Sequence, residues 1–212
     1  ERGIRRRLAP MMGGDQRRLR MAYSLQFTMP GTPVLRYGDE IGMGEELELP
    51  ERDAIRTPMQ WSGTENGGFS EAPTSRLIRP VVASSPYGFK DVNVTDQRLE
   101  PDSMLSWFER MLHSLRECDE IGSGTHRVVD GTPDAVLAHV AEGPTGVVLF
   151  VHNLSDEPQV VHPTGVPTED QPPVEVFSDH PYDGETDPSE LEVGPYGFRW
   201  IRLRRSHGPA PG

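Results

Sequence analysis

Two stretches of the chain repeat apolar residues at the three-to-four-residue spacing of an α-helix. In residues 15–29, Leu19, Tyr23 and Phe27 recur on one face, which predicts a helix packed on that side. Asp15 stands at the position of an N-cap, and a Pro-Gly pair directly follows the last turn. The pattern therefore predicts a helix with defined start and stop signals.

Residues 102–119 carry the second helical pattern. Asp102 and Ser103 are the cap candidates at its start. One face of the expected helix is apolar, and it comprises Leu105, Phe108, Met111, Leu112 and Leu115. We therefore expect this helix to bury a continuous stripe of apolar side chains along one face.

Between the two helices the pattern indicates one short strand and a long loop. Residues 32–37 (TPVLRY) predict a buried strand that ends at Gly38. Helix, tight turn, strand and acidic loop in this order are typical of one step of a parallel α/β structure. Residues 39 to about 101 lack periodicity and are rich in Gly, Pro, Ser and Asn. Large apolar residues scattered through them predict an ordered, packed loop.

After Gly122 the pattern changes from helical to alternating. Short β-branched or aromatic segments between turn residues predict strands at 126–130, 135–141, 146–152, 157–162, 174–177 and 196–203. They form an antiparallel β module, so the fold class is α/β followed by all-β, with a boundary near residue 120. The Pro-containing segments 163–173 and 179–190 are expected as exposed loops. We expect residues 120–205 to fold independently.

Charge is distributed unevenly along the 212 residues. The net charge is −12, yet the first 30 residues hold seven arginines against two acidic residues. A basic start such as Arg5-Arg6-Arg7 is compatible with nucleic-acid binding, but no aromatic residues are interleaved with it and the acidic remainder repels phosphate. We expect a solvated approach to a helix, no nucleic-acid partner and, because the apolar runs are short, no membrane partner. With Cys118 as the only cysteine and no visible signal peptide, the expected location is cytoplasmic.

The string GTPVLRYGDEIGMG places Asp39 and Glu40 just after the end of the predicted strand. In β/α barrels, active sites are assembled at that end of the strands. Adjacent carboxylates point in different directions and are a poor acid/base pair for one bond. We favour a role in fixing the loop through backbone N–H groups, with substrate contact as the alternative.

The string RDAIRTPMQWS contains three further candidates for ligand contact. Arg56 is a permanent cation whose planar fork suits a carboxylate or sugar hydroxyls. Gln60 both donates and accepts hydrogen bonds, and Trp61 offers a flat apolar face for a pyranose ring. For Trp61, simple packing of the loop is an equal alternative, whereas for Arg56 we favour a functional role.

Other local patterns give weaker evidence of a functional site. The seven histidines show no metal-ligand spacing, and Asn153-Leu154-Ser155 matches a glycosylation sequon without evidence of secretion. Tyr196, Phe198 and Trp200 stand at strand spacing and so share one face. We favour that face as the core of the β module over an exposed sugar-binding platform.

Taken together, the two strings resemble the eighth-strand region of the α-amylase superfamily (glycoside hydrolase family 13). The RTPMQW form is similar to the oligo-1,6-glucosidase and trehalose synthase branch, and the opening RGIRRRLAPMMGGDQRRLRMAYSLQFTMPG and the later GGFS and PYGFKDVNV are similar to trehalose synthases. The resemblance implies the last part of a (β/α)8 TIM barrel followed by a C-terminal antiparallel β-sandwich domain. Residues 1–119 would hold helix 7, strand 8, a long loop and helix 8, and residues 120–212 the β domain.

The resemblance also implies a function for a longer parent protein. Family members use three carboxylates that follow barrel strands four, five and seven, and none of those motifs is present here, so no catalytic residue is assigned and this chain alone should be inactive. Arg56 matches an arginine that closes the inner end of the glucose pocket. The substrate-binding candidates are Arg56, Asp39, Glu40, Gln60 and Trp61.

The expected parent isomerises maltose to trehalose by retaining intramolecular glucosyl transfer. The alternatives are an α-glucosidase or α-amylase hydrolase, or a non-catalytic carbohydrate-binding module. Expected partners are maltose, trehalose or other α-glucosides, together with the missing N-terminal part of the barrel or a second copy of the chain. No metal or other cofactor is expected in this chain, and calcium in the parent would be held by residues outside it.

Overall fold

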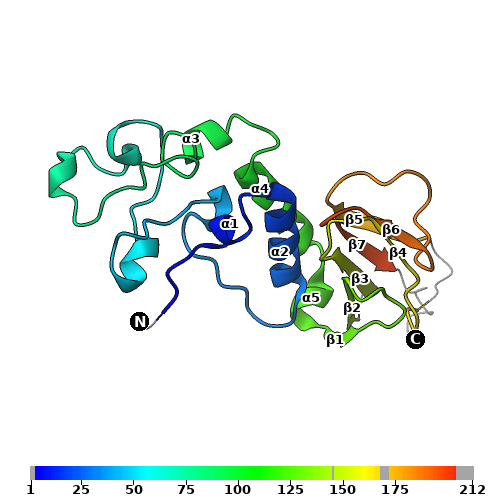
Figure 1. The fold of residues 1–212 in the computed structure, drawn as a ribbon. Helices are drawn as coiled ribbons and strands as arrows, with labels where there is room; N and C mark the ends of the chain where they lie inside the picture. Colours follow the sequence, from blue (N-terminus) through cyan, green and yellow to red (C-terminus); the bar gives the residue numbers. More distant parts are fainter. Residues whose placement is uncertain (1–2, 145, 168–171, 204–212) are drawn as a thin grey trace, which may run out of the picture. The chain divides into compact units, whose positions relative to one another are not determined.

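A computed structural model describes residues 3–144, 146–167 and 172–203 of the chain (Figure 1). It divides into two compact units, one formed by Glu1–Leu19 with Val34–Arg110 and the other by Arg20–Pro33 with Met111–Gly212. The units are interleaved along the chain, whereas the predicted domains, 1–119 and 120–212, meet at a single boundary. The reason is that residues 20–33 pack with the β module and not with the segments that flank them in sequence.

Both predicted helices are present with start signals as expected. Helix α2 spans Gln16–Thr28, and an oxygen of Asp15 accepts hydrogen bonds from the backbone N–H groups of Arg17 and Arg18 at 2.9 and 3.4 Å. Helix α4 spans Met104–Arg116, and the Ser103 hydroxyl accepts the N–H of Ser106 at 3.1 Å. Three short helices accompany them: α1 (Leu8–Met11), α3 (Val94–Gln97) and α5 (Asp119–Ser123).

The predicted strand over residues 32–37 is absent. The segment is irregular, and Val34 is 78% exposed. A parallel strand needs backbone partners on its flanks, and the described part of the first unit contains no strand that pairs with it. The apolar run TPVLRY is therefore exposed in part.

The long loop from residue 39 to 101 is ordered and packed, as predicted. It contains four short 3₁₀ segments, at Asp39–Ile41, Glu51–Ile55, Glu65–Gly68 and Thr74–Arg76. A small apolar core holds it together, formed by Ile41, Met43, Met59 and Val94, with Val92 and Leu105 against it.

The described part of the second unit contains seven strands in two antiparallel sheets (Figure 1). The five-stranded sheet has the order β1-β2-β3-β7-β5, formed by Thr125–Val128, Val136–Gly143, Gly146–Asn153, Phe198–Leu203 and Val174–Ser178. The two-stranded sheet pairs β4 (Gln159–Val161) with β6 (Leu191–Val193). Every predicted strand of the β module appears, whereas β6 has only three residues and was not predicted. Part of the predicted loop 163–173, residues 168–171, and the tail 204–212 lie outside the described residues.

Each face of the five-stranded sheet is covered. One face packs on the two-stranded sheet through a cluster of aliphatic residues that includes Val140, Leu149, Val161, Leu191 and Ile201, all fully buried. The other face is aromatic, with Phe150, Phe198 and Trp200 fully buried, and helix α2 contacts it through Ser24 and Thr28. The aromatic face is therefore core, as favoured above, and Phe198 and Trp200 offer no exposed platform for a sugar. In the described residues no helix has the length and apolar character needed to cross a bilayer.

Candidate functional site

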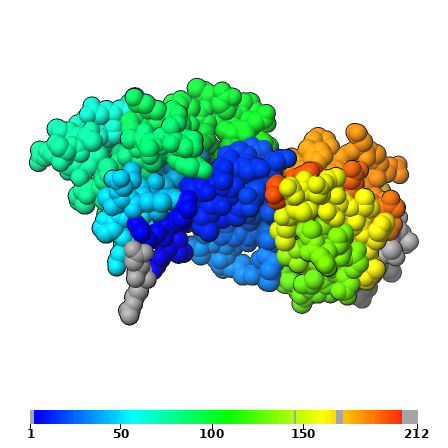
Figure 2. All heavy atoms as spheres, in the orientation of Figure 1, coloured from blue at the N-terminus to red at the C-terminus, as the bar shows by residue number. Residues whose placement is uncertain are grey.

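A surface cavity of about 650 Å³ lies within the first unit, under the long loop. Three of the five predicted ligand-binding residues line it: Glu40, Arg56 and Trp61. Figure 2 shows the loop that carries the cavity in cyan to green, at the surface of this unit. The remaining lining residues include two more aromatics and two more cations, namely Tyr37, Phe69, Arg76 and Arg79. The cavity therefore combines flat apolar faces with charged hydrogen-bond donors.

Arg56 contributes an uncommitted guanidinium group to this cavity. Its side chain is 46% exposed, and in the described part of the chain it makes no hydrogen bond. Its nearest carboxylate is that of Asp53, with Nη1 4.0 Å from Oδ1. The same Oδ1 accepts a hydrogen bond from Nη2 of Arg79 at 2.8 Å. Asp53 thus lies between the two cations, and the donors of Arg56 stay available to a ligand hydroxyl or carboxylate.

Trp61 has a fixed backbone and a half-exposed ring. Its N–H donates to the carbonyl of Gly67 at 2.8 Å, and its carbonyl accepts from the N–H of Thr95 at 3.0 Å. The side chain nevertheless remains 49% exposed, and Phe69 on the same cavity is 51% exposed. Exposed aromatic faces held by a fixed backbone suit the stacking of a flat, partly apolar ligand.

Asp39 and Gln60 are placed differently from Arg56 and Trp61, and neither lines the cavity. The carboxylate of Asp39 accepts hydrogen bonds from Nη1 of Arg7 at 3.2 Å and from the backbone N–H of Arg36 at 3.0 Å. Gln60 is fully buried, and its amide donates to the carbonyls of Tyr87 at 3.1 Å and Val92 at 2.5 Å. Both side chains hold the loop in place, which for Asp39 is the role that the sequence favoured. Substrate contact by either residue stays a prediction.

Arginines of the basic opening segment form hydrogen bonds and ion pairs within the fold. Arg7 is 3% exposed, and its guanidinium bonds the carbonyls of Tyr37 and Ile55 in addition to Asp39. Arg6 pairs with Glu45 at 2.8 Å. Burial lowers the pKa of Arg7, while Asp39 opposes that shift. Arg7, which was expected to be solvated, therefore connects the opening segment with residues 37–39 and with Ile55, around the candidate site.

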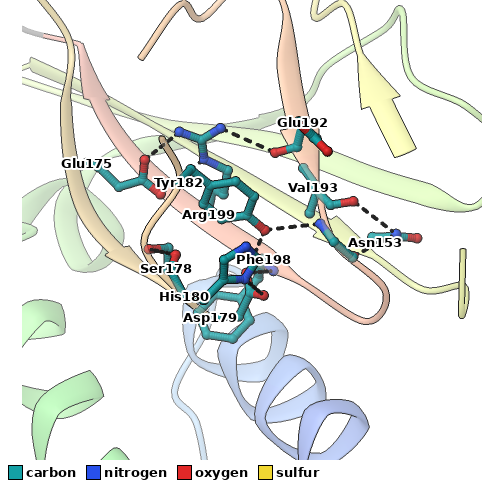
Figure 3. A network of polar contacts seen from close by, with 11 residues as sticks. Asn153, Glu175, Ser178, Asp179, His180, Tyr182, Glu192, Val193, Phe198 and Arg199 are labelled. Carbon is teal, nitrogen blue, oxygen red and sulfur yellow. Dashed lines mark hydrogen bonds and ion pairs between the residues drawn. The ribbon is translucent and has the colours of Figure 1, made fainter. Parts of the chain in front are cut away.

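A second polar network lies in the second unit (Figure 3). One oxygen of Asp179 accepts from the hydroxyl of Tyr182 and from the N–H of Phe198, both at 2.9 Å, and the other lies 2.6 Å from Nδ1 of His180. Arg199 stacks over the Tyr182 ring at 4.2 Å and pairs with Glu175, and burial raises the pKa of the Tyr182 hydroxyl. Each group has a partner within the fold, so the network holds the segment after β5 against β7.

Two other sequence motifs are accounted for by burial. The amide of Asn153 is fully buried and donates to the carbonyls of Glu157 at 2.7 Å and Gly194 at 2.9 Å, so the sequon presents no accessible acceptor in this fold. Cys118 is buried, and burial raises the pKa of its thiol to about 11, which disfavours the nucleophilic thiolate. Among the described residues, no group of three His, Cys, Asp or Glu side chains could hold a metal ion.

Comparison with known proteins assigns the two parts of the chain separately. Residues 5–124 match the α-amylase catalytic domain, and residues 133–201 match the C-terminal immunoglobulin-like domain of D-apionate lactonase. Among solved structures, trehalose-6-phosphate hydrolase of Bacillus licheniformis superposes with a TM-score of 0.76 at 20% identity, over 94% of this chain and 41% of that protein. Trehalulose synthase of Pseudomonas mesoacidophila superposes with a TM-score of 0.73 at 19% identity, over 94% and 42%. These structures establish the fold: the later part of a TIM barrel followed by a β domain.

Curated relatives are more similar in sequence. Trehalose synthase of Pimelobacter sp. is 42% identical over 95% of this chain, and trehalose synthase/amylase of Mycolicibacterium smegmatis is 38% identical over 99%. The chain spans 36% and 37% of the lengths of these two proteins. With the α-amylase catalytic domain matched over more than half of its residues, the chain belongs to the α-amylase family of carbohydrate-active enzymes.

Proposed function

We propose that this chain is the C-terminal part of an enzyme that isomerises maltose to trehalose, and that its first unit supplies one wall of the glucose pocket. The observation that carries the proposal is the cavity that brings Glu40, Arg56 and Trp61 together. The names of its relatives, trehalose synthases at 38–42% identity, support the same reaction. We keep the cytoplasm as the proposed location, since Cys118 is the only cysteine.

The reaction proceeds by double displacement with retention at the anomeric carbon. A carboxylic acid protonates the glycosidic oxygen while a carboxylate attacks C1, which releases glucose and leaves a covalent glucosyl-enzyme. The released glucose then turns and attacks C1 with its own anomeric hydroxyl, and the product is trehalose. The acidic groups for these steps would come from the preceding part of the barrel, so the 212 residues alone are expected to be inactive.

The residues of this chain bind the sugar and exclude water. Arg56 donates hydrogen bonds to a ligand hydroxyl or to a carboxylate of the preceding barrel part. Trp61 provides a half-exposed face against which a pyranose ring stacks. Because water competes with glucose for the glucosyl-enzyme, a closed pocket favours isomerisation over hydrolysis. Maltose, trehalose and related α-glucosides are therefore the proposed ligands.

The test is Arg56→Ala in a full-length parent, with trehalose and glucose measured separately from maltose. We expect a higher KM for maltose and a higher ratio of glucose to trehalose. Arg98→Ala is the matched control, since Arg98 is exposed and does not line the cavity. Unchanged kinetics for both products in Arg56→Ala would remove Arg56 from the site.

The same assay separates the two remaining candidate functions. A wild-type parent that forms glucose without trehalose would be a hydrolase, which is the alternative within the family. A carbohydrate-binding module is disfavoured by the burial of Phe198 and Trp200. Isothermal titration of the 212-residue chain with maltose tests it, because millimolar or tighter binding would support a sugar-binding role for the chain alone.

A further inference from the structure

Three histidines form a row across neighbouring strands of the five-stranded sheet. His126, His139 and His152 come from β1, β2 and β3, and their rings stack at centroid distances of 6.3 Å and 6.0 Å. His139 is 3% exposed and His152 is fully buried. Buried imidazoles at this density require an explanation, because neither the candidate cavity nor the proposed reaction uses them.

The row attaches helix α2 to the sheet. Nε2 of His152 lies 2.9 Å from the hydroxyl of Ser24, which also accepts the indole N–H of Trp200 at 2.8 Å. Nε2 of His139 lies 3.0 Å from the carbonyl oxygen of Thr28 and therefore carries the proton of that hydrogen bond. On the side of α2, these contacts involve Ser24 and Thr28, which lie one helical turn apart. They therefore fix the second half of α2 on the aromatic face.

Both imidazoles are held in their neutral form. In the described part of the chain, Nδ1 of His139 and of His152 is buried without a hydrogen-bond partner. Protonation would place an N–H without an acceptor and a positive charge in an apolar layer, beside a second imidazole. Burial lowers the pKa of His139; the hydrogen bond to Thr28 opposes this shift, and His126 adds to it. Burial lowers the pKa of His152 well below its usual value; His139 adds to that shift, and hydrogen bonding to Ser24 opposes it.

The charged groups on the elements around the row do not offset this cost. Arg20 on α2 stands one turn before Ser24 and brings no negative charge to the row. At the α5 end of the sheet, Glu120 is paired with Arg202 at 3.4 Å. His113 on α4 and Glu117 just after its end are 79% and 57% exposed, and their side chains lie 3.4 Å apart.

We propose that His139 and His152 form a pH-sensitive latch that releases helix α2 from the β module in mildly acidic solution. When α2 separates, both imidazoles reach water and take up protons. A folded pKa below the unfolded value of about 6.5 means that the attachment is fully present above that pH and is lost as pH falls through the folded pKa. At pH 5.5, one unit below the unfolded pKa, each histidine can shift the equilibrium between attached and released α2 by at most about tenfold, and both together by at most about 100-fold.

Hydrogen exchange of the 212-residue chain tests the latch. We expect the protection factors of amides in residues 20–28, corrected for intrinsic exchange, to fall between pH 7.5 and 5.5, by up to about 100-fold, while amides of β3 keep their protection. Parallel loss of protection in β3 would mean global unfolding and would overturn the proposal. So would constant protection of α2 across this range.

A double variant, His139→Gln with His152→Gln, removes the titration but keeps amide donors towards Thr28 and Ser24. Its α2 protection should vary by less than about threefold over the same pH range. His113→Gln, at an exposed histidine, should behave as the wild type. Should the double variant not fold, NMR titration of the wild-type imidazoles decides the question: titration of both near pH 6.5 with α2 still protected would refute the latch.

Discussion

The hydroxyl of Ser24 is the hydrogen-bond partner of two buried side chains of the β module, Trp200 and His152, and this makes Ser24→Ala an informative perturbation. The substitution removes the only hydrogen-bond partner that the structure gives to the Trp200 indole N–H, at 2.8 Å, and to Nε2 of His152, at 2.9 Å. Both groups are fully buried, so water cannot replace the lost bonds without opening the interface.

The magnitude follows from the two groups left unsatisfied. Each buried polar group without a partner costs about 1–3 kcal/mol. Alanine has a better helix propensity than serine, which offsets about 0.5 kcal/mol in the middle of α2. For two groups we therefore expect the free energy of unfolding of the second unit to fall by about 1.5–5.5 kcal/mol, a large fraction of the stability of a single domain.

Urea denaturation followed by tryptophan fluorescence and circular dichroism measures this loss. With a typical slope of about 2 kcal/mol per molar urea, the midpoint should move down by about 1–3 M. Ser123→Ala is the matched control, because Ser123 is an exposed helical serine whose hydroxyl bonds only the carbonyl of Asp119. A loss below about 0.5 kcal/mol for Ser24→Ala, or one equal to that of the control, would refute the reasoning.

Three further predictions follow from individual side chains. Leu149→Ala, in the core between the sheets, should cost about 2–5 kcal/mol in a denaturant titration, whereas Val160→Ala, at a 49% exposed position, should stay within about 0.5 kcal/mol. Cys118, buried with its thiol pKa raised to about 11, should not react with a thiol reagent at pH 8 until the chain is unfolded; complete labelling of the native protein would contradict the described burial. Asp15→Ala should destabilise α2 by about 1 kcal/mol at neutral pH. The hydrogen bond from the Arg17 side chain is the main cause of the lowered pKa of Asp15, so the capping contribution is present above about pH 4 and is lost as pH falls through the folded pKa. Unfolding free energies of wild type and variant should therefore converge once the pH lies below the folded pKa of Asp15, and a constant difference down to strongly acidic pH would contradict the assignment.

Most of the fold could be predicted from local patterns, because helix and strand signals depend on residues that are neighbours in the sequence. The apolar spacing and the cap at Asp15 define α2, and alternation with turn residues defines six of the seven strands. The segments that were missed depend on distant partners. Strand β6 has three residues whose pairing with β4 cannot be read from their own sequence. The apolar run over residues 32–37 matches a strand locally, yet no described strand of its unit pairs with it.

Residues of the candidate site could be predicted from the sequence only where the residue type allows few roles. Arg56 and Trp61 line the cavity, as a permanent cation and an aromatic ring in one motif suggested. Gln60, from the same motif, can donate and accept hydrogen bonds both to a ligand and to the loop backbone. The motif alone therefore could not distinguish a ligand contact from the loop hydrogen bonds that Gln60 makes. Arg79 was missed because its partner Asp53 is 26 residues away, and no local signal connects the two.

The interleaving of the two units affects how the β module can be isolated. A fragment cut near residue 120 retains the seven described strands but loses residues 20–33 and 111–119, which belong to the same compact unit. Such a fragment would uncover Trp200 and the imidazole of His152, which bond to Ser24, and its soluble expression would suffer accordingly. A design that keeps residues 111–119 and fuses residues 20–33 to them through a flexible linker would restore the missing layer. In this sense the segment behaves as a structural part of the immunoglobulin-like domain that is encoded within the barrel.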